Sequence, residues 1–147
     1  MPADPDCLFC RIVAGDAAAE VVYSDDVSVA FLDIRPVFHG HTLLVTREHY
    51  ATLPDLPASL VEPYFVNVRM LSVAVRDAME AQGTFVAINN VVSQSVPHLH
   101  THVVPRVKKD GLRGFFWPRT KYEHDDHAAQ TAERIRGAIS SAAEPRS

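Results

Sequence analysis

The sequence predicts an α+β domain in which an antiparallel sheet of about five strands packs with one long helix. Short segments rich in β-branched and apolar residues are separated by turn signals, which is typical of strands. One longer segment carries apolar side chains at helical spacing. Short strands in antiparallel order, with the helices to one side, favour the α+β class over the other layered folds.

Turn-forming residues bound the predicted strands. Ser24-Asp25-Asp26 joins the first two strands in a hairpin-like turn, and Pro36 with Gly40 marks the loop that follows. A second loop is expected at residues 54–57. The predicted strands are residues 21–23, 27–33, 41–46, 84–89 and 98–105.

Three helices are expected. Residues 7–14 form a short N-terminal helix that Gly15 ends. Ser59, the first residue of an S-x-x-E capping box, begins the long helix, and Gly83 ends it. The last helix spans about residues 126–139, with Ala132, Ile135 and Ile139 facing inward. The apolar stripe of the long helix, interpreted as core packing, is Leu60, Tyr64, Val68, Leu71, Val75 and Met79.

Length and composition predict a single domain over residues 1–147, with a core at about 7–106 and a helical C-terminal extension at 107–147, whose tail frays from Ala142. The net charge of −4 gives no reason to expect nucleic acid as a partner. No apolar run approaches the roughly 20 residues that cross a bilayer. Without a signal-peptide pattern at the N-terminus, a cytoplasmic protein is expected.

Three histidines alternate with other residues along the last predicted strand. Because successive side chains of a strand point to opposite faces, His98, His100 and His102 share one face. Each imidazole brings two nitrogens that need partners. Three on one face therefore favour a site that binds a metal, moves protons or attacks an electrophile. His100, with a neighbour on each side to orient it, is the candidate nucleophile.

Cys7 and Cys10 form a C-x-x-C motif at the first helix. The motif is compatible with a redox pair, half of a metal site or coincidence. No strand precedes it, as one would in a thioredoxin-like protein, so half of a zinc site is preferred. Spacing alone does not choose the other ligands among His39, His41, His49, His98, His100, His102, His124 and His127.

His98-Leu99-His100-Thr101-His102-Val103-Val104 resembles the His-φ-His-φ-His-φ-φ signature of the histidine-triad (HIT) nucleotide-binding proteins, with Thr101 at an apolar position. Residues 7–15 resemble the N-terminal segment of that family, and residues 31–36 resemble its nucleoside-binding strand. Residues 40–50 resemble the next strand and its exit. The resemblance covers about residues 7–106 and implies a HIT-like fold.

This resemblance implies a hydrolase or nucleotidyl transferase that cleaves nucleotide conjugates at the α-phosphorus through a covalent nucleotidyl intermediate on His100. His102 would contact the phosphate and assist the leaving group, and Asp33 would hold the ribose hydroxyls. The other residues that the resemblance places at the nucleotide are Phe9, Ile12, Leu32 and Ile34 around the base, and Asn89, Gln94 and Ser95 at the phosphates.

Family members with an N-terminal C-x-x-C resemble the galactose-1-phosphate uridylyltransferases, which bind zinc through two cysteines and two histidines. Carried over, the ligands of a structural Zn²⁺ are Cys7, Cys10, His49 and His98. His98 then becomes an anchor that positions the neighbouring nucleophile, in addition to its place in the triad. His41 is expected to lie behind the site rather than to bind the metal.

Phosphoramidase-like activity on a purine nucleotide conjugate with an AMP-like or GMP-like moiety is the expected function, and a homodimer is the expected assembly. A dinucleoside polyphosphate hydrolase and a non-catalytic nucleotide-binding or regulatory module are the alternatives. The predicted phosphate loop at residues 89–94 is shorter than in the purine phosphoramidase branch. The specificity for the leaving group therefore stays open.

Overall fold

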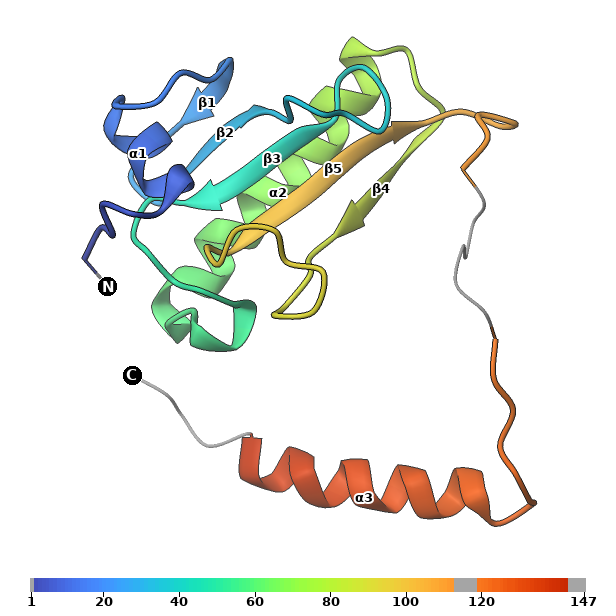
Figure 1. The fold of residues 1–147 in the computed structure, drawn as a ribbon. Helices are drawn as coiled ribbons and strands as arrows, with labels where there is room; N and C mark the ends of the chain where they lie inside the picture. Colours follow the sequence, from blue (N-terminus) through green and yellow to red (C-terminus); the bar gives the residue numbers. More distant parts are fainter. Residues whose placement is uncertain (1, 113–118, 143–147) are drawn as a thin grey trace. The chain divides into compact units, whose positions relative to one another are not determined.

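The computed structural model describes residues 2–112 and 119–142. The chain divides into two compact units, Met1–Asp110 and Gly111–Ser147, which are described separately. The first unit carries the sheet and two α-helices, and the second carries α3 (His127–Ala142) (Figure 1). In the described ranges, none of the helices combines the length and the hydropathy that a membrane span requires.

The sheet has five strands in the order β1-β2-β3-β5-β4, and every neighbouring pair is antiparallel. The α+β class and the antiparallel sheet predicted from the sequence are therefore confirmed. β5 lies between β3 and β4, so its residues are paired on both sides. The strands are β1 (Val21–Ser24), β2 (Ser28–Leu32), β3 (Thr42–Thr46), β4 (Gly83–Ala87) and β5 (His100–Arg106).

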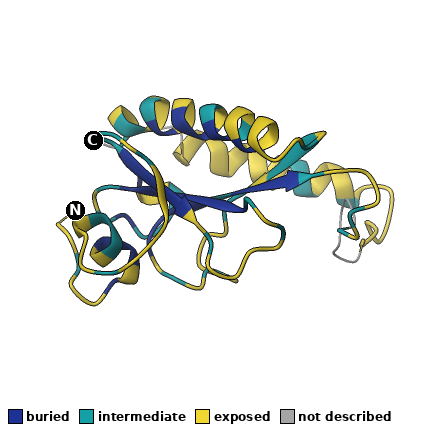
Figure 2. Cartoon of the chain, turned by 90° about the horizontal axis from the view of Figure 1, so that it is seen from above, coloured by how far each residue is buried: buried dark blue, intermediate teal, exposed yellow. Residues whose placement is uncertain are grey.

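The two helices of the first unit cover opposite faces of the sheet (Figures 1 and 2). α2 (Ala58–Ala78) packs on β3, β4 and β5, and its buried Tyr64 and Leu71 meet Leu44 and Val103 from the sheet. α1 (Leu8–Ala14) packs on the other face, where it contributes Phe9. The alternation of strand side chains supplies apolar residues to both layers.

Most element ends differ by one or two residues from the sequence prediction, and the larger differences have identifiable causes. α2 begins at Ala58 after Pro57, so Ser59 lies inside the first turn and does not cap the helix. α2 ends at Ala78, and Gly83 begins β4 instead of ending the helix, because Gln82 already pairs with Arg106 of β5. The last strand begins at His100 and not at residue 98, and a short 3₁₀ helix at residues 53–55 overlaps the loop predicted at residues 54–57.

In the second unit, the predicted C-terminal helix is present as α3, but it buries none of its described side chains. Ile135 and Ile139 are 56% and 58% exposed, so the prediction that they face inward is wrong. Within this unit, the described residues offer α3 no other helix or strand to pack against. Residues 113–118, which precede α3 in the sequence, and residues 143–147 of the predicted frayed tail lie outside the described residues.

Candidate active site and metal centre

The histidine run lies on the sheet face that carries α1. His100 pairs with Val45 of β3, a residue of the apolar cluster on that face. Leu99 and Val103 point the other way, into the core beneath α2. The common face predicted for the histidines is the one observed, although the first of them lies just before β5.

On this face of the sheet, the aromatic rings and the histidine rings pack against one another. The ring centre of Phe9 lies 5.0 Å from that of His100 and 6.0 Å from that of His98, and His100 lies 5.1 Å from His102. Phe31 of β2 packs edge-on to Phe9 at 5.4 Å. Sequence reasoning missed Phe31, although the alternation along β2 indicates that it shares the face of Phe9.

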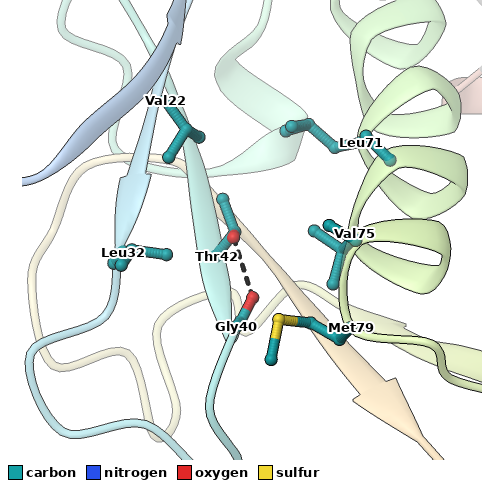
Figure 3. A pocket seen from close by; sticks show the side chains of 9 residues that line it. Val22, Leu32, Gly40, Thr42, Leu71, Val75 and Met79 are labelled. Atoms are coloured by element: carbon teal, nitrogen blue, oxygen red, sulfur yellow. Dashed lines mark hydrogen bonds between the residues drawn. The ribbon is translucent and has the colours of Figure 1, made fainter.

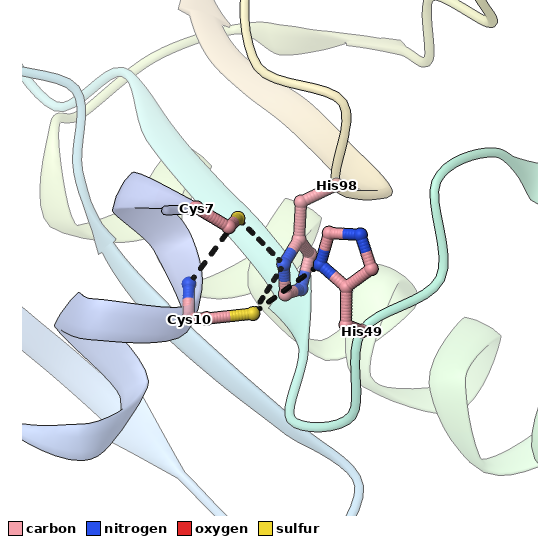
Figure 4. Close-up of side chains that lie close together, drawn as sticks. All are labelled: Cys7, Cys10, His49 and His98. Atoms are coloured by element: carbon pink, nitrogen blue, oxygen red, sulfur yellow. Dashed lines mark hydrogen bonds between the residues drawn. The ribbon is translucent and has the colours of Figure 1, made fainter. Parts of the chain in front are cut away.

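Four potential ligands meet where α1, the segment after β3 and the start of β5 come together (Figure 4). The ligand atoms of Cys7, Cys10, His49 and His98 all lie within 4.8 Å of one another. Cys10 Sγ lies 3.3 Å from His49 Nδ1 and 3.5 Å from His98 Nδ1, and Cys7 Sγ lies 3.4 Å from His98 Nδ1. These residues, implied by the resemblance to be ligands, therefore lie together and could hold a metal ion.

The tautomer of His98 suits a metal ligand. Its Nε2 lies 2.7 Å from the carbonyl oxygen of Thr46, which only accepts hydrogen bonds, so Nε2 carries the proton. Burial lowers the pKa of His98 to about 4, so the ring is neutral near pH 7. A neutral ring with its proton on Nε2 presents the Nδ1 lone pair to the two cysteines.

The distances among these donors fit zinc. Zinc–sulfur bonds of about 2.3 Å and zinc–nitrogen bonds of about 2.0 Å in a tetrahedron place sulfur and nitrogen about 3.5 Å apart. The three S···N distances of 3.3, 3.4 and 3.5 Å agree with that value. Burial raises the pKa of Cys10, and a bound cation would reverse that effect by favouring the thiolate.

His100 has the arrangement of a nucleophile. Its Nδ1 lies 2.7 Å from the backbone carbonyl oxygen of His98, so Nδ1 carries the proton and donates it to that oxygen. In the neutral ring, Nε2 then holds the free lone pair. The carbonyl that orients the His100 ring thus belongs to His98, a residue of the cysteine–histidine cluster.

A second cluster surrounds His102. Its Nδ1 lies 3.0 Å from Nε2 of His41, and the Asp33 carboxylate lies 3.6 Å from the same Nε2. The backbone N–H of Val37 donates to Nδ1 of His41 at 3.1 Å. Because that nitrogen accepts, the proton of neutral His41 lies on Nε2 and is donated to His102. His102 then carries its own proton on Nε2.

This proton pattern argues against a metal at the second cluster, although Asp33, His41 and His102 also lie within 4.8 Å of one another. The nitrogen of His41 that faces the cluster is protonated and offers no lone pair. Burial lowers the pKa of both histidines, that of His102 to about 4, so both rings are neutral near pH 7. The second cluster is therefore a chain of hydrogen-bond donors that ends at the Nε2–H of His102.

The residues predicted around the base are spread over several elements. Phe9 is buried against His100, and Ile12 packs at the edge of the same apolar cluster. Ile34, in the loop after β2, is 94% exposed. Asp33 accepts a hydrogen bond from the backbone N–H of Arg35 at 2.8 Å, which fixes its carboxylate beside His41.

Leu32 lines an apolar groove between the sheet and the C-terminal half of α2 (Figure 3). Thr42 and Met79 lie on opposite walls of this groove. Because side chains alternate along β2, Leu32 and Phe31 point to opposite faces of the sheet. The structure thus brings Phe31, but not the Leu32 side chain, to the cluster that contains Phe9.

The residues predicted at the phosphates lie in the connection between β4 and β5. Gln94 donates from Nε2 to the carbonyl of Ala51 at 2.6 Å and accepts from the N–H of Val91 at 2.9 Å, so its amide holds the loop together. Asn89 and Ser95 are exposed. Asn89 donates to the carbonyl of Ser93 at 3.4 Å.

Residues 14–109 match the model of the HIT domain family, which covers more than half of the chain. The chain is 35% identical over 136 residues to Protein hit of Bacillus subtilis, covering 91% of this chain and 92% of that protein. It is 32% identical over 114 residues to adenosine 5′-monophosphoramidase of Schizosaccharomyces pombe, covering 76% and 83% respectively.

Among solved structures, the chain resembles a zinc-bound histidine triad family protein from Mycobacterium smegmatis. The TM-score is 0.69 at 34% identity, and the match covers 95% of this chain and 98% of that one. The chain therefore belongs to the HIT family.

Proposed function

We propose that this member of the HIT family hydrolyses purine nucleoside 5′-phosphoramidates at the α-phosphorus, through a covalent nucleotidyl intermediate on His100. One observation carries the proposal: the 2.7 Å contact of His100 Nδ1 with the His98 carbonyl, which leaves the Nε2 lone pair free to attack. The activity named for the Schizosaccharomyces pombe relative supports the same substrate class.

In the first step, Nε2 of His100 forms a bond to phosphorus and the phosphorus–nitrogen bond of the substrate breaks. The leaving nitrogen accepts a hydrogen bond from the Nε2–H of His102, takes a proton from water and departs as an amine. The N–H of His41 donates to Nδ1 of His102 and so keeps the proton of His102 on Nε2. Burial lowers the pKa of the His102 ring to about 4, so the ring stays neutral and keeps this hydrogen-bond donor across the physiological pH range.

In the second step, water attacks phosphorus, the bond to His100 breaks and the nucleotide is released. The proton that this water gives up replaces the one taken from water in the first step, so each cycle consumes one water and leaves the protein unchanged. Asp33, whose carboxylate is oriented by the Arg35 N–H, would accept from the ribose hydroxyls. Phe9 and Ile34 would contact the base, with Asn89 and Ser95 near the phosphate.

The cysteine–histidine cluster fits a structural zinc ion bound by Cys7, Cys10, His49 and His98. When bound, the ion cross-links α1, the segment after β3 and the start of β5. His98 would then hold its backbone carbonyl at a fixed distance from His100. The zinc-bound Mycobacterium smegmatis structure supports this assignment.

We further propose a cytoplasmic homodimer. A reducing compartment keeps Cys7 and Cys10 as free thiols that can bind metal. β4 is an edge strand of the sheet, and exposed apolar residues of the adjacent α2, including Phe65 and Val66, accompany it. Light scattering coupled to gel filtration should give twice the chain mass of 16.2 kDa, and the mass of a single chain would refute the assembly.

The test of the reaction is intact-protein mass spectrometry after a brief acid quench with adenosine 5′-phosphoramidate. The wild type should gain a transient mass of one adenylyl group, and His100→Ala should gain none and lose activity about a thousandfold or more. His124→Ala, which changes a histidine of the second unit, is the matched control and should behave like the wild type. Turnover at the wild-type rate in His100→Ala would refute the mechanism.

A further inference from the structure

The loop between β4 and β5 (residues 88–99) presents two exposed apolar side chains at its tip. Val91 is 74% exposed and Val92 is 79% exposed. Val91 also has a φ of +69°, in the left-handed region that β-branched residues rarely adopt. Strained backbone of this kind persists where the surrounding structure holds it, and it gathers at ligand-binding sites.

Hydrogen bonds fix the loop in this conformation. The Gln94 amide bridges the N–H of Val91, at 2.9 Å, and the carbonyl of Ala51, at 2.6 Å. Asn90 Oδ1 accepts from the backbone N–H of Leu53 at 2.9 Å. Both polar side chains thus tie the loop to the segment before α2, and the two valines are left facing solvent.

Both ends of this loop lie close to the residues of the histidine face of the sheet. Ala87, the last residue of β4, pairs with His102, so the loop begins beside the strand that carries the histidines. At the other end, Val96 packs against the cluster that contains Phe9. The loop therefore begins and ends in the immediate surroundings of the nucleophile.

The loop carries no formal charge. Residues 88–97 read Ile-Asn-Asn-Val-Val-Ser-Gln-Ser-Val-Pro and contain no Asp, Glu, Lys or Arg. Such a loop offers no ionic partner to a charged group, and its outermost side chains favour contact with apolar surface. The part of a substrate that lies beyond the α-phosphate would meet this surface.

We propose that Val91 and Val92 form an apolar wall for the leaving group, so that the enzyme selects phosphoramidates whose amine is aromatic or branched over those whose amine carries a second charge. This inference rests on the proposed function and specifies its substrate class. Contact of an apolar amine with the wall removes exposed valine surface from water, whereas a second ammonium group would be desolvated there without a partner.

The test compares kcat/KM for two adenosine 5′-phosphoramidates, one releasing tryptamine and one releasing putrescine. The wild type should prefer the tryptamine conjugate about tenfold or more. Val92→Asp should lower that ratio about tenfold, because it removes apolar surface and adds a carboxylate that attracts the second ammonium. Val91→Gly, which relieves the left-handed strain and deletes the side chain, should lower the ratio without lowering the unfolding temperature.

Val22→Asp is the matched control, because Val22 is an exposed valine of β1 that lines the groove on the other face of the sheet, beneath α2. Its ratio should equal that of the wild type. If Val92→Asp and Val91→Gly both turn over the conjugates at the wild-type ratio, the wall is refuted while the proposed function stands. If the wild type hydrolyses neither conjugate and forms no adenylyl adduct, the proposed function fails and this inference fails with it.

Discussion

The two side-chain clusters on the histidine face contain similar residues but differ in what their histidines offer: one presents lone pairs that can bind a metal, and the other presents N–H donors. In the cysteine–histidine cluster, the Thr46 carbonyl holds the proton of His98 on the far nitrogen, and the near nitrogen faces Cys7 and Cys10 with its lone pair. In the Asp33–His41–His102 cluster, the Val37 N–H occupies the far nitrogen of His41, so the near nitrogen carries the proton. A single backbone group on each far nitrogen separates a metal ligand from a proton donor.

Charge state does not make this distinction. Burial lowers the pKa values of both His98 and His102 to about 4, so both rings are neutral near pH 7. The tautomer, and not the number of histidines gathered, therefore decides what each cluster can bind. Each cluster can be altered by mutation while the other serves as its control.

The largest expected effect is the loss of metal in Cys10→Ser. Wild-type protein should carry about one zinc per chain, and the variant should carry almost none, because a hydroxyl is a poor zinc ligand. With zinc at a thousand times its dissociation constant, the loss of binding costs about 4 kcal/mol of unfolding free energy. Plasma emission spectrometry and urea unfolding, with and without a chelator, measure the two effects.

His41→Asn is the matched control for that experiment. It alters the second cluster and should leave the zinc content at one per chain. A loss of zinc in this variant, or full zinc content in Cys10→Ser, would contradict the assignment of the metal to the first cluster.

The next effect is on catalysis. His41→Ala removes the N–H that faces Nδ1 of His102, and kcat should fall about 10- to 100-fold while KM stays near the wild-type value. His41→Gln supplies an amide N–H in a similar place and should recover part of the rate. A change confined to KM, or no recovery with glutamine, would show that His41 does not act by donating to His102.

A smaller effect concerns acid stability. Burial lowers the pKa of His102 from its usual 6.5 to about 4 in the folded protein, so the unfolded chain binds this proton first as the pH falls. The contribution of neutral His102 to the free energy of unfolding is complete above pH 6.5 and is lost toward pH 4. It amounts to about 2 kcal/mol after allowance for the partly exposed ring. Between pH 7 and 4.5, urea unfolding should show a steeper fall in the free energy of unfolding for the wild type than for His102→Gln. Parallel falls in the two proteins would show that the pKa of His102 is not lowered by folding.

The sequence predicted the fold class and the shared face of the histidines because both depend on periodicity, which the chain displays directly. The ends of the helices were harder to predict from the sequence. Ser59 and Gly83 are residue types that often cap helices, but the hydrogen bond of Gln82 with Arg106 of β5 moved the end of α2. The hydrogen-bond chain to His102 needs a backbone N–H from residue 37 beside a ring from residue 41. No spacing in the sequence reveals that contact, because the loop conformation creates it.

Val37→Pro gives the smallest effect and the most direct test of the comparison. Proline has no N–H, so His41 is free to carry its proton on Nδ1 and to turn the Nε2 lone pair toward Asp33 and His102. The second cluster should then acquire a weak zinc site, seen by calorimetry as a second equivalent that the wild type lacks. His102→Gln in the same background should abolish it. If Val37→Pro keeps its fold and binds no second zinc, the backbone N–H is not what excludes metal from this cluster.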